Sequence, residues 1–189
     1  MIRKADVDEV FLNKKTLNQI RRGLDKYHWL QATFAEKGCG GLAFQRKYKG
    51  FYRVRRGPDW CGQYFALMES ARRDKLDFEA VLLRMAKQLG RIEASFASKL
   101  VATIDPRKPV IDRYVLKSFG LQLPRYGSEL RKEEIVSLYK QLGNEYKRLK
   151  LGAYIQKRFD EAFPMSGITA LKKIDLVLWQ IRPKNTPST

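Results

Sequence analysis

The chain has 189 residues, of which 44% are hydrophobic and 12% aromatic, so it can bury a core and is not a disordered polycation. It carries 38 Lys and Arg residues against 20 Asp and Glu residues, which gives a net charge of +18. A folded domain this basic is expected to bind a polyanion, with nucleic acid ahead of an anionic membrane.

The remaining composition limits the cellular setting and the cofactors. No apolar run approaches the length of a membrane span, and the opening residues MIRKADVDEVF lack the apolar region of a signal peptide. Two cysteines, Cys39 and Cys61, and one histidine, His28, are too few for a usual zinc or iron–sulfur site. We therefore expect a monomer in the cytoplasm, at the nucleoid, with no metal, no other cofactor and no membrane partner.

Apolar residues recur at helical spacing in four segments. In chain order these segments are 11–24, 78–89 behind an Asp77 cap, 135–149 between Ser128 and Gly152, and 171–181 before Pro183. The tail 183–189 is expected to fray. The pattern predicts a mainly α protein in a single domain, 1–189.

The segment 45–56, QRKYKGFYRVRR, differs from these helices because it holds six basic residues and no acid. Its alternating residues favour a short strand or β-hairpin. Its aromatic residues lie among the basic ones, which suits a nucleic acid whose bases can stack. A solvated basic loop with its aromatics anchored in the core is the alternative. The predicted DNA contacts here are Arg46, Lys47, Lys49, Arg53, Arg55 and Arg56.

The segment 88–121 holds a carboxylate in a position suited to chemistry. RIEASFASKLVATI favours two short helical turns joined by small residues, and DPRKP interrupts the helix. Asp112 then opens the next helix, where an N-cap is worth about 1 kcal/mol over Ala. A carboxylate fixed at a helix start can also stabilise a sugar cation or activate a water, as cleavage of an N-glycosidic bond requires. The cap and the catalytic interpretation are compatible.

These motifs resemble a known enzyme family. ASFASKLVATI and PVIDRYVLKSFGL are similar to the hairpin and catalytic loop of the HhH-GPD superfamily of helix-hairpin-helix DNA glycosylases. The resemblance covers about 77–121 and implies a two-lobed helical fold. It implies hydrolysis of the N-glycosidic bond of a damaged or modified base flipped out of duplex DNA, with Asp112 as the essential carboxylate. It also implies DNA contacts from the hairpin, at Arg91, Ser95, Ser98 and Lys99.

Two departures from the family pattern refine this expectation. Ala94, Ser95 and Phe96 stand where the family hairpin carries glycines. Members that also cut the strand use a hairpin lysine that forms an imine, and here Ala94 or Ser95 holds that place, with Lys99 as the nearest alternative. The sequence therefore favours a monofunctional glycosylase without AP-lyase activity, and a lyase remains the second option.

The base pocket is predicted from aromatic residues in 59–69, DWCGQYFALME. Trp60, Gln63 and Tyr64 are the candidates, against the alternative that the rings are ordinary core residues. Trp179 is assigned to the core, and Asp175 is expected to pair with a lysine at the surface.

The biological role stays open between base-excision repair and defence against modified foreign DNA. A non-catalytic basic DNA- or RNA-binding protein is the alternative function.

Overall fold

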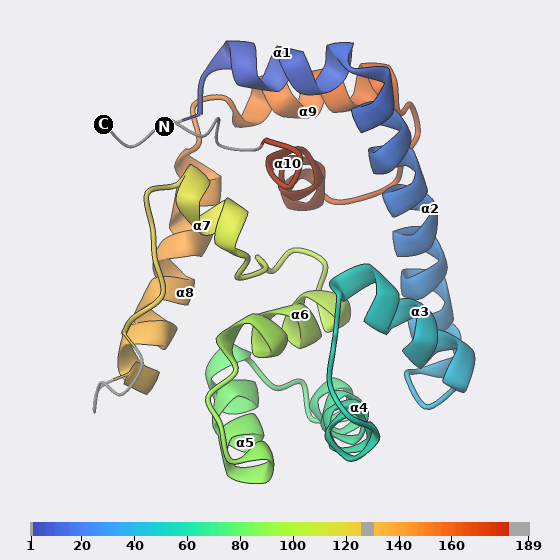
Figure 1. Ribbon diagram of the computed structural model, residues 1–189, viewed down its shortest axis with the longest axis vertical. Helices are drawn as coiled ribbons and strands as arrows, with labels where there is room; N and C mark the ends of the chain where they lie inside the picture. The colour runs from blue at the N-terminus through green and yellow to red at the C-terminus, as the bar shows by residue number, and fades with distance from the viewer. Residues whose placement is uncertain (1, 126–130, 182–189) are drawn as a thin grey trace.

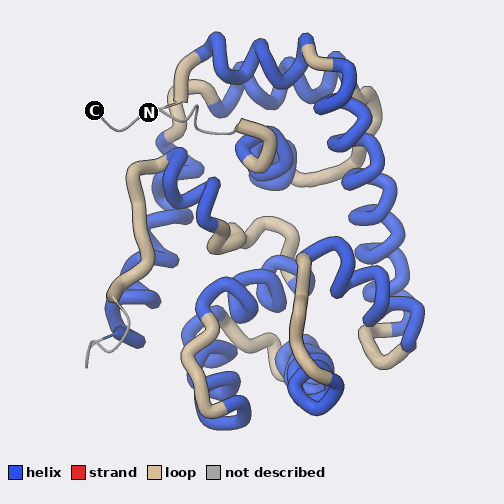
Figure 2. The backbone as a smooth tube through the Cα atoms, in the orientation of Figure 1, coloured by secondary structure: helices blue, strands red, loops and turns tan. Residues whose placement is uncertain are grey.

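The computed structural model describes residues 2–125 and 131–181, and all regular structure in these residues is α-helical (Figure 1, Figure 2). The prediction of a mainly α protein is confirmed. The helices are α1 (Lys4–Leu12), α2 (Lys14–Lys37), α3 (Leu42–Tyr52), α4 (Pro58–Arg73), α5 (Phe78–Leu89), α6 (Ala94–Ile104), α7 (Arg113–Ser118), α8 (Arg131–Arg148), α9 (Gly152–Ala162) and α10 (Ala170–Leu178).

The helices form two groups joined by the long helix α2 (Figure 1). One group contains α3 to α6, and the other contains α1 and α7 to α10. Helix α2 packs against α1 in one group and against α3 in the other. Every helix contributes to one cluster of buried apolar side chains, so the two groups share a core.

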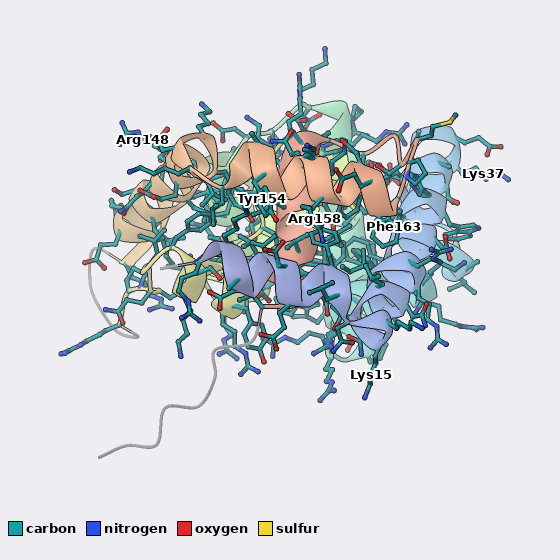
Figure 3. The ribbon with its side chains drawn as sticks, turned by 90° about the horizontal axis from the view of Figure 1, so that it is seen from above. Lys15, Lys37, Arg148, Tyr154, Arg158 and Phe163 are labelled. Atoms are coloured by element: carbon teal, nitrogen blue, oxygen red, sulfur yellow. The ribbon has the colours of Figure 1, made fainter. Side chains whose placement is uncertain are left out.

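The first helix is fixed to the C-terminal part of the chain by polar contacts. Figure 3 shows Tyr154 and Arg158 of α9 beside α1. The Tyr154 hydroxyl donates a hydrogen bond to Asp8, and the Arg158 guanidinium lies 5.5 Å from the centre of the Phe11 ring. These contacts hold α1 on α9 and so place the start of α2, which lines one of the cavities described below.

The predicted strand or hairpin at 45–56 is wrong, because most of this segment belongs to helix α3. Phe44, Tyr48 and Tyr52 recur every four residues and are buried, which is the spacing of one helix face. Only the last four residues lie beyond the helix, where Arg53 ends it in the left-handed conformation (φ 54°). The alternating residues at the end of this segment therefore belong to the last turn of α3 and the short stretch 53–56 after it, and not to a strand.

Helix boundaries were predicted in part. Asp77 caps α5 by accepting a hydrogen bond from the Ala80 backbone N–H (2.9 Å), as expected. The first predicted helix is divided at Asn13, which ends α1 and caps α2 through the Thr16 N–H (3.0 Å). Gly152 begins α9 and does not simply end the preceding helix. The predicted start at Ser128, Pro183 and the tail 183–189 lie outside the described residues.

The turn before α6 lies earlier in the chain than the hairpin that the sequence predicted around Ala94 to Ser98. Residues 94–104 form the single helix α6, and the turn that joins it to α5 occupies 90–93. Gly90 starts this turn with φ of 66°, a conformation that costs glycine little. The small residues Ala94, Ala97 and Ser98 are consequently buried on a helix face and do not form a turn.

Candidate functional site

Residues 105–112 connect α6 to α7 and place Asp112. The Thr169 hydroxyl at the start of α10 donates a hydrogen bond to the Pro106 carbonyl oxygen (2.9 Å). The buried Ser98 hydroxyl of α6 accepts one from the Ile111 N–H (2.8 Å). Tethers to two different helices therefore fix the backbone just before Asp112.

Asp112 is the N-cap of α7, as predicted from the sequence. Its Oδ1 accepts a hydrogen bond from the Tyr114 N–H at 2.8 Å. No hydrogen bond from a described residue reaches Oδ2, and the side chain is half-buried. One oxygen thus holds the carboxylate in place while the other remains available to a ligand or a water.

Lys99 of α6 lies near Asp112. Burial lowers the pKa of the Lys99 ammonium, and the neighbouring Asp112 carboxylate acts in the opposite direction. Its Nζ lies 5.0 Å from the centre of the Phe96 ring, and no described residue forms a salt bridge with it. The site therefore pairs a fixed carboxylate with an ammonium that gives up its proton more easily than a free lysine.

Both residues line one cavity, here called the aromatic cavity, of about 420 Å³. It lies between α2, the end of α3, α6, the start of α7 and α10. Its rings are Phe51, Tyr52, Tyr114 and Trp179, and its basic residues are Arg22, Lys26, Arg53 and Lys99. Asp112 is the one carboxylate among the residues that line it. The volume lies within the roughly 300–1,000 Å³ typical of pockets for small ligands.

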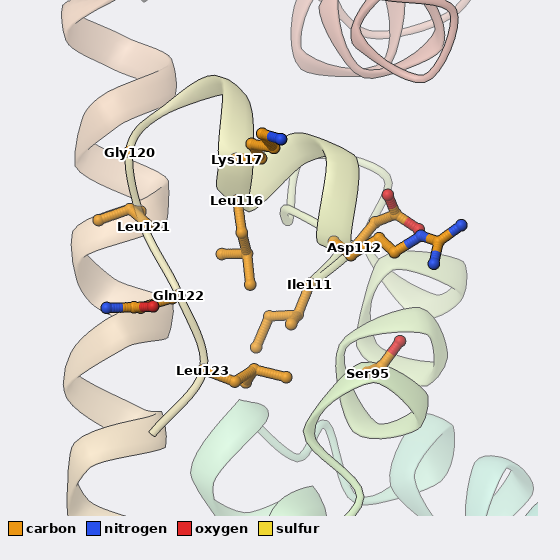
Figure 4. A pocket seen from close by; sticks show the side chains of 10 residues that line it. Ser95, Ile111, Asp112, Leu116, Lys117, Gly120, Leu121, Gln122 and Leu123 are labelled. Atoms are coloured by element: carbon orange, nitrogen blue, oxygen red, sulfur yellow. The ribbon is translucent and has the colours of Figure 1, made fainter. Parts of the chain in front are cut away.

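A second cavity, the aliphatic cavity, lies on another side of Asp112 and measures about 720 Å³. Figure 4 shows Ile111, Leu116 and Leu123 pointing toward one another between α7 and the segment 120–123. Ser95 at the start of α6 also lines it. This cavity offers apolar contact but no aromatic ring, so the aromatic cavity is the better place for a stacked base.

A buried charge pair lies behind the aromatic cavity. The Lys172 ammonium donates to Asp175 Oδ2 at 2.7 Å, and the Tyr146 hydroxyl donates to Oδ1 at 3.0 Å. Lys172 Nζ is 4.8 Å from the Trp179 ring centre and 5.8 Å from that of Phe51. The predicted pairing of Asp175 with a lysine is correct, but its surface location is wrong, because Asp175 is fully buried.

The hairpin residues predicted to contact DNA lie in different surroundings. Arg91 is exposed in the turn before α6. Ser98 is fully buried, so a direct DNA contact by its side chain is incompatible with this structure. Its hydroxyl instead donates to the Ser95 carbonyl oxygen (2.9 Å) and accepts from Ile111. Ser98 therefore positions the Asp112 loop.

The basic residues of 45–56 follow α3 and the segment after it. Lys47 Nζ lies 4.0 Å from the Trp29 ring centre, and Arg56 forms a salt bridge with Glu93 at 2.5 Å. Arg53 reaches the aromatic cavity. Arg46 and Arg55 are exposed, and Lys49 is half-buried. The basic side chains of this segment therefore extend from the edge of the aromatic cavity onto the surface beyond it.

The residues predicted to form the base pocket lie together on α4 but away from Asp112. Trp60 stacks on Tyr64 with ring centres 4.9 Å apart, and Phe96 closes the group. The Tyr64 hydroxyl donates to the Phe96 carbonyl oxygen (3.0 Å). Gln63 is exposed. None of the three predicted residues lines either cavity that includes Asp112.

Three residues that complete the aromatic cavity, Trp179, Arg22 and Lys26, were not predicted from the sequence. Trp179 was assigned to the core, yet it is half-buried and lines the cavity wall. Arg22 and Lys26 lie four residues apart on α2, so helical spacing placed them on one face. No local pattern links this face to Asp112 or to Trp179, because tertiary packing alone brings them together.

Comparisons with known proteins add no further assignment. No family model, no curated protein and no solved structure matches the chain. Within the described residues, no helix is long and apolar enough to cross a membrane.

Proposed function

We propose that the protein is a DNA glycosylase that hydrolyses the N-glycosidic bond of a base turned out of duplex DNA. The observation that supports it most is the aromatic cavity, where Asp112 lies beside rings that can stack a base and beside several basic side chains. The resemblance of about 77–121 to the HhH-GPD family supports the same function. The two groups of helices with Asp112 between them are what a two-lobed glycosylase would need.

Asp112 supplies the carboxylate that this reaction requires. As the bond between C1′ and the base breaks, positive charge develops on the sugar, and a fixed anion nearby stabilises it. The oxygen that the Tyr114 N–H leaves available can accept the proton of the attacking water. The products are a free base and an abasic site that keeps both strands intact.

The charge of the chain supports a DNA substrate. Arg22, Lys26 and Arg53 are exposed at the aromatic cavity, where they can pair with phosphates beside a flipped nucleotide. The net charge of +18 also suits a second candidate, a non-catalytic DNA- or RNA-binding protein. Binding by either would weaken steeply with salt, so only release of a base separates the two.

The test is mass spectrometry of bases released from a panel of duplexes with damaged and naturally modified bases. We expect the wild-type protein to release at least one base and Asp112→Asn to lose this activity while it keeps DNA affinity. Asp59→Asn, an exposed carboxylate on α4, is the matched control and should retain activity. Equal release by Asp112→Asn would contradict the mechanism.

The same reactions show whether the enzyme is monofunctional. We propose hydrolysis by water, so the abasic strand should break only after treatment with alkali. Strand breakage without alkali would instead favour an imine formed by Lys99, the lysine that lines the cavity with Asp112.

A further inference from the structure

The charge around the aromatic cavity restricts the kind of base that it can hold. Four basic residues, Arg22, Lys26, Arg53 and Lys99, line it with a single carboxylate, Asp112. Asp175 does not line it and is already paired with Lys172. With Arg22, Lys26 and Arg53 paired to phosphates, Lys99 is the cation left to face the base. A base that carries a positive charge, such as 7-methylguanine or 3-methyladenine, would therefore be held beside a charge of the same sign.

The aromatic walls reinforce this restriction. A cation gains from an aromatic ring by approaching its electron-rich face. The Lys172 ammonium already lies 4.8 Å from the Trp179 ring centre and 5.8 Å from the Phe51 ring centre, behind the cavity. Lys172 therefore already takes up part of the cation–π attraction of these two rings, so less of it is left for a second cation. Stacking of an uncharged base is not penalised in this way.

An uncharged base makes a demand on the enzyme that a cationic base does not. A cationic base leaves as a neutral molecule, whereas an uncharged base leaves with the electron pair of the broken bond and becomes an anion. That charge needs a proton donor or a cation close to the departing atom. Lys99 is suited to this task, because it lines the cavity with Asp112, forms no salt bridge with a described residue and has a lowered pKa.

We propose that the aromatic cavity selects an uncharged base and that Lys99 is a second catalytic residue, which protonates this base as it leaves. The inference rests on the proposed glycosylase function. The bond between C1′ and the base nitrogen breaks, and its electron pair takes a proton from the Lys99 ammonium. Water adds to C1′ and gives its proton to Asp112, and solvent then returns the proton to Lys99. The sum is one water consumed, one free base and one abasic sugar.

The first arm of the test compares substrate classes with the wild-type protein. Duplexes carry 7-methylguanine or 3-methyladenine as cationic bases, and uracil, hypoxanthine, 8-oxoguanine or 5-hydroxymethyluracil as uncharged bases. We expect release of an uncharged base and no acceleration for the cationic ones. Preferential release of a cationic base would overturn the inference but leave the proposed function intact. Release of no base at all would overturn the proposed function itself.

The second arm changes Lys99 and measures single-turnover excision of the released base. Lys99→Met should lower the rate by about 10²–10⁴-fold, the usual contribution of a general acid or base. Lys99→Arg keeps the charge but holds its proton too tightly, so it should also be slow. Lys87→Met, an exposed lysine that lines neither cavity, is the matched control. Wild-type rates for Lys99→Arg would overturn the proton transfer.

A third measurement separates proton donation from a structural role. Within a series of 5-substituted uracils, the base anion becomes more stable as the substituent withdraws electrons. The defect of Lys99→Met should therefore shrink from uracil to 5-fluorouracil, because a better leaving group needs less protonation. A defect of the same size for both bases would show that Lys99 acts by shaping the site, which would overturn its catalytic role.

Discussion

Two aromatic clusters of this protein use similar residues and differ in what closes them. In the first, Trp60, Tyr64 and Phe96 pack on one another, and the Tyr64 hydroxyl is satisfied by a backbone carbonyl. In the second, Phe51 and Trp179 leave a cavity of about 420 Å³ beside Asp112. Aromatic content therefore does not identify a pocket, because rings that satisfy one another leave no space for a ligand.

One half-buried tryptophan from each cluster offers the most direct test of this difference. Trp60→Ala and Trp179→Ala remove the same side chain at similar exposure, so each should lower the free energy of unfolding by about 3 kcal/mol. Only Trp179→Ala should also slow excision, by roughly tenfold to a hundredfold, since a stacked base is worth about 1–3 kcal/mol. Urea unfolding and excision at low temperature measure the two effects. If both variants excised the base at the same rate, Trp179 would contribute no more to excision than Trp60, which would contradict this prediction.

The buried Lys172–Asp175 pair behind the second cluster should also be costly to break. Asp175→Asn leaves the Lys172 ammonium buried without a counter-ion, so we expect a loss of about 3–5 kcal/mol in the free energy of unfolding. Calorimetry or urea unfolding would measure it. The triple variant Lys172→Met, Asp175→Leu, Tyr146→Phe removes every polar partner and should recover most of the loss. A mild effect of Asp175→Asn would show that the pair is not held as tightly as its distances indicate.

A smaller effect is expected where α6 holds the catalytic loop. Ser98→Ala leaves the buried Ile111 N–H without its acceptor, which should cost about 1–3 kcal/mol. It should also slow excision without a matching loss of DNA affinity, because Ile111 directly precedes Asp112 and a shift of its backbone would move the carboxylate. Ser118→Ala is the control, since that hydroxyl only donates to the Tyr114 carbonyl oxygen within its own helix. A normal rate for Ser98→Ala would show that its hydrogen bond does not position Asp112.

The smallest effect concerns Arg53 at the edge of the second cluster. Its φ of 54° is costly for a residue with a side chain, so Arg53→Gly should raise the free energy of unfolding by up to about 1 kcal/mol. The same change should weaken DNA binding, because it removes a cation that lines the cavity. Arg55→Gly, whose φ is not positive, should bring no gain in stability. A loss of stability in Arg53→Gly would show that the Arg53 side chain contributes more than its backbone costs.

Features that depend only on adjacent residues were the ones predicted correctly from the sequence. The Asp77 and Asp112 caps depend on a few adjacent residues, and both appear as hydrogen bonds in the structure. The strand at 45–56 failed because its short alternation competed with a longer helical period set by Phe44, Tyr48 and Tyr52. The turn predicted around Ala94 to Ser98 was wrong because small residues occur on closely packed helix faces as well as in turns.

The sequence by itself determined the helical class, the strong positive charge and the place of Asp112 at the start of a helix. Each of these depends on composition or on neighbours within one helical turn. Only the tertiary structure decided that Lys99 lies near Asp112, that Trp179 lines a cavity and that Asp175 is buried. Lys99 lies on α6, Asp175 lies on α10 and Trp179 directly follows α10. Packing on a shared core, not local spacing, brings them together.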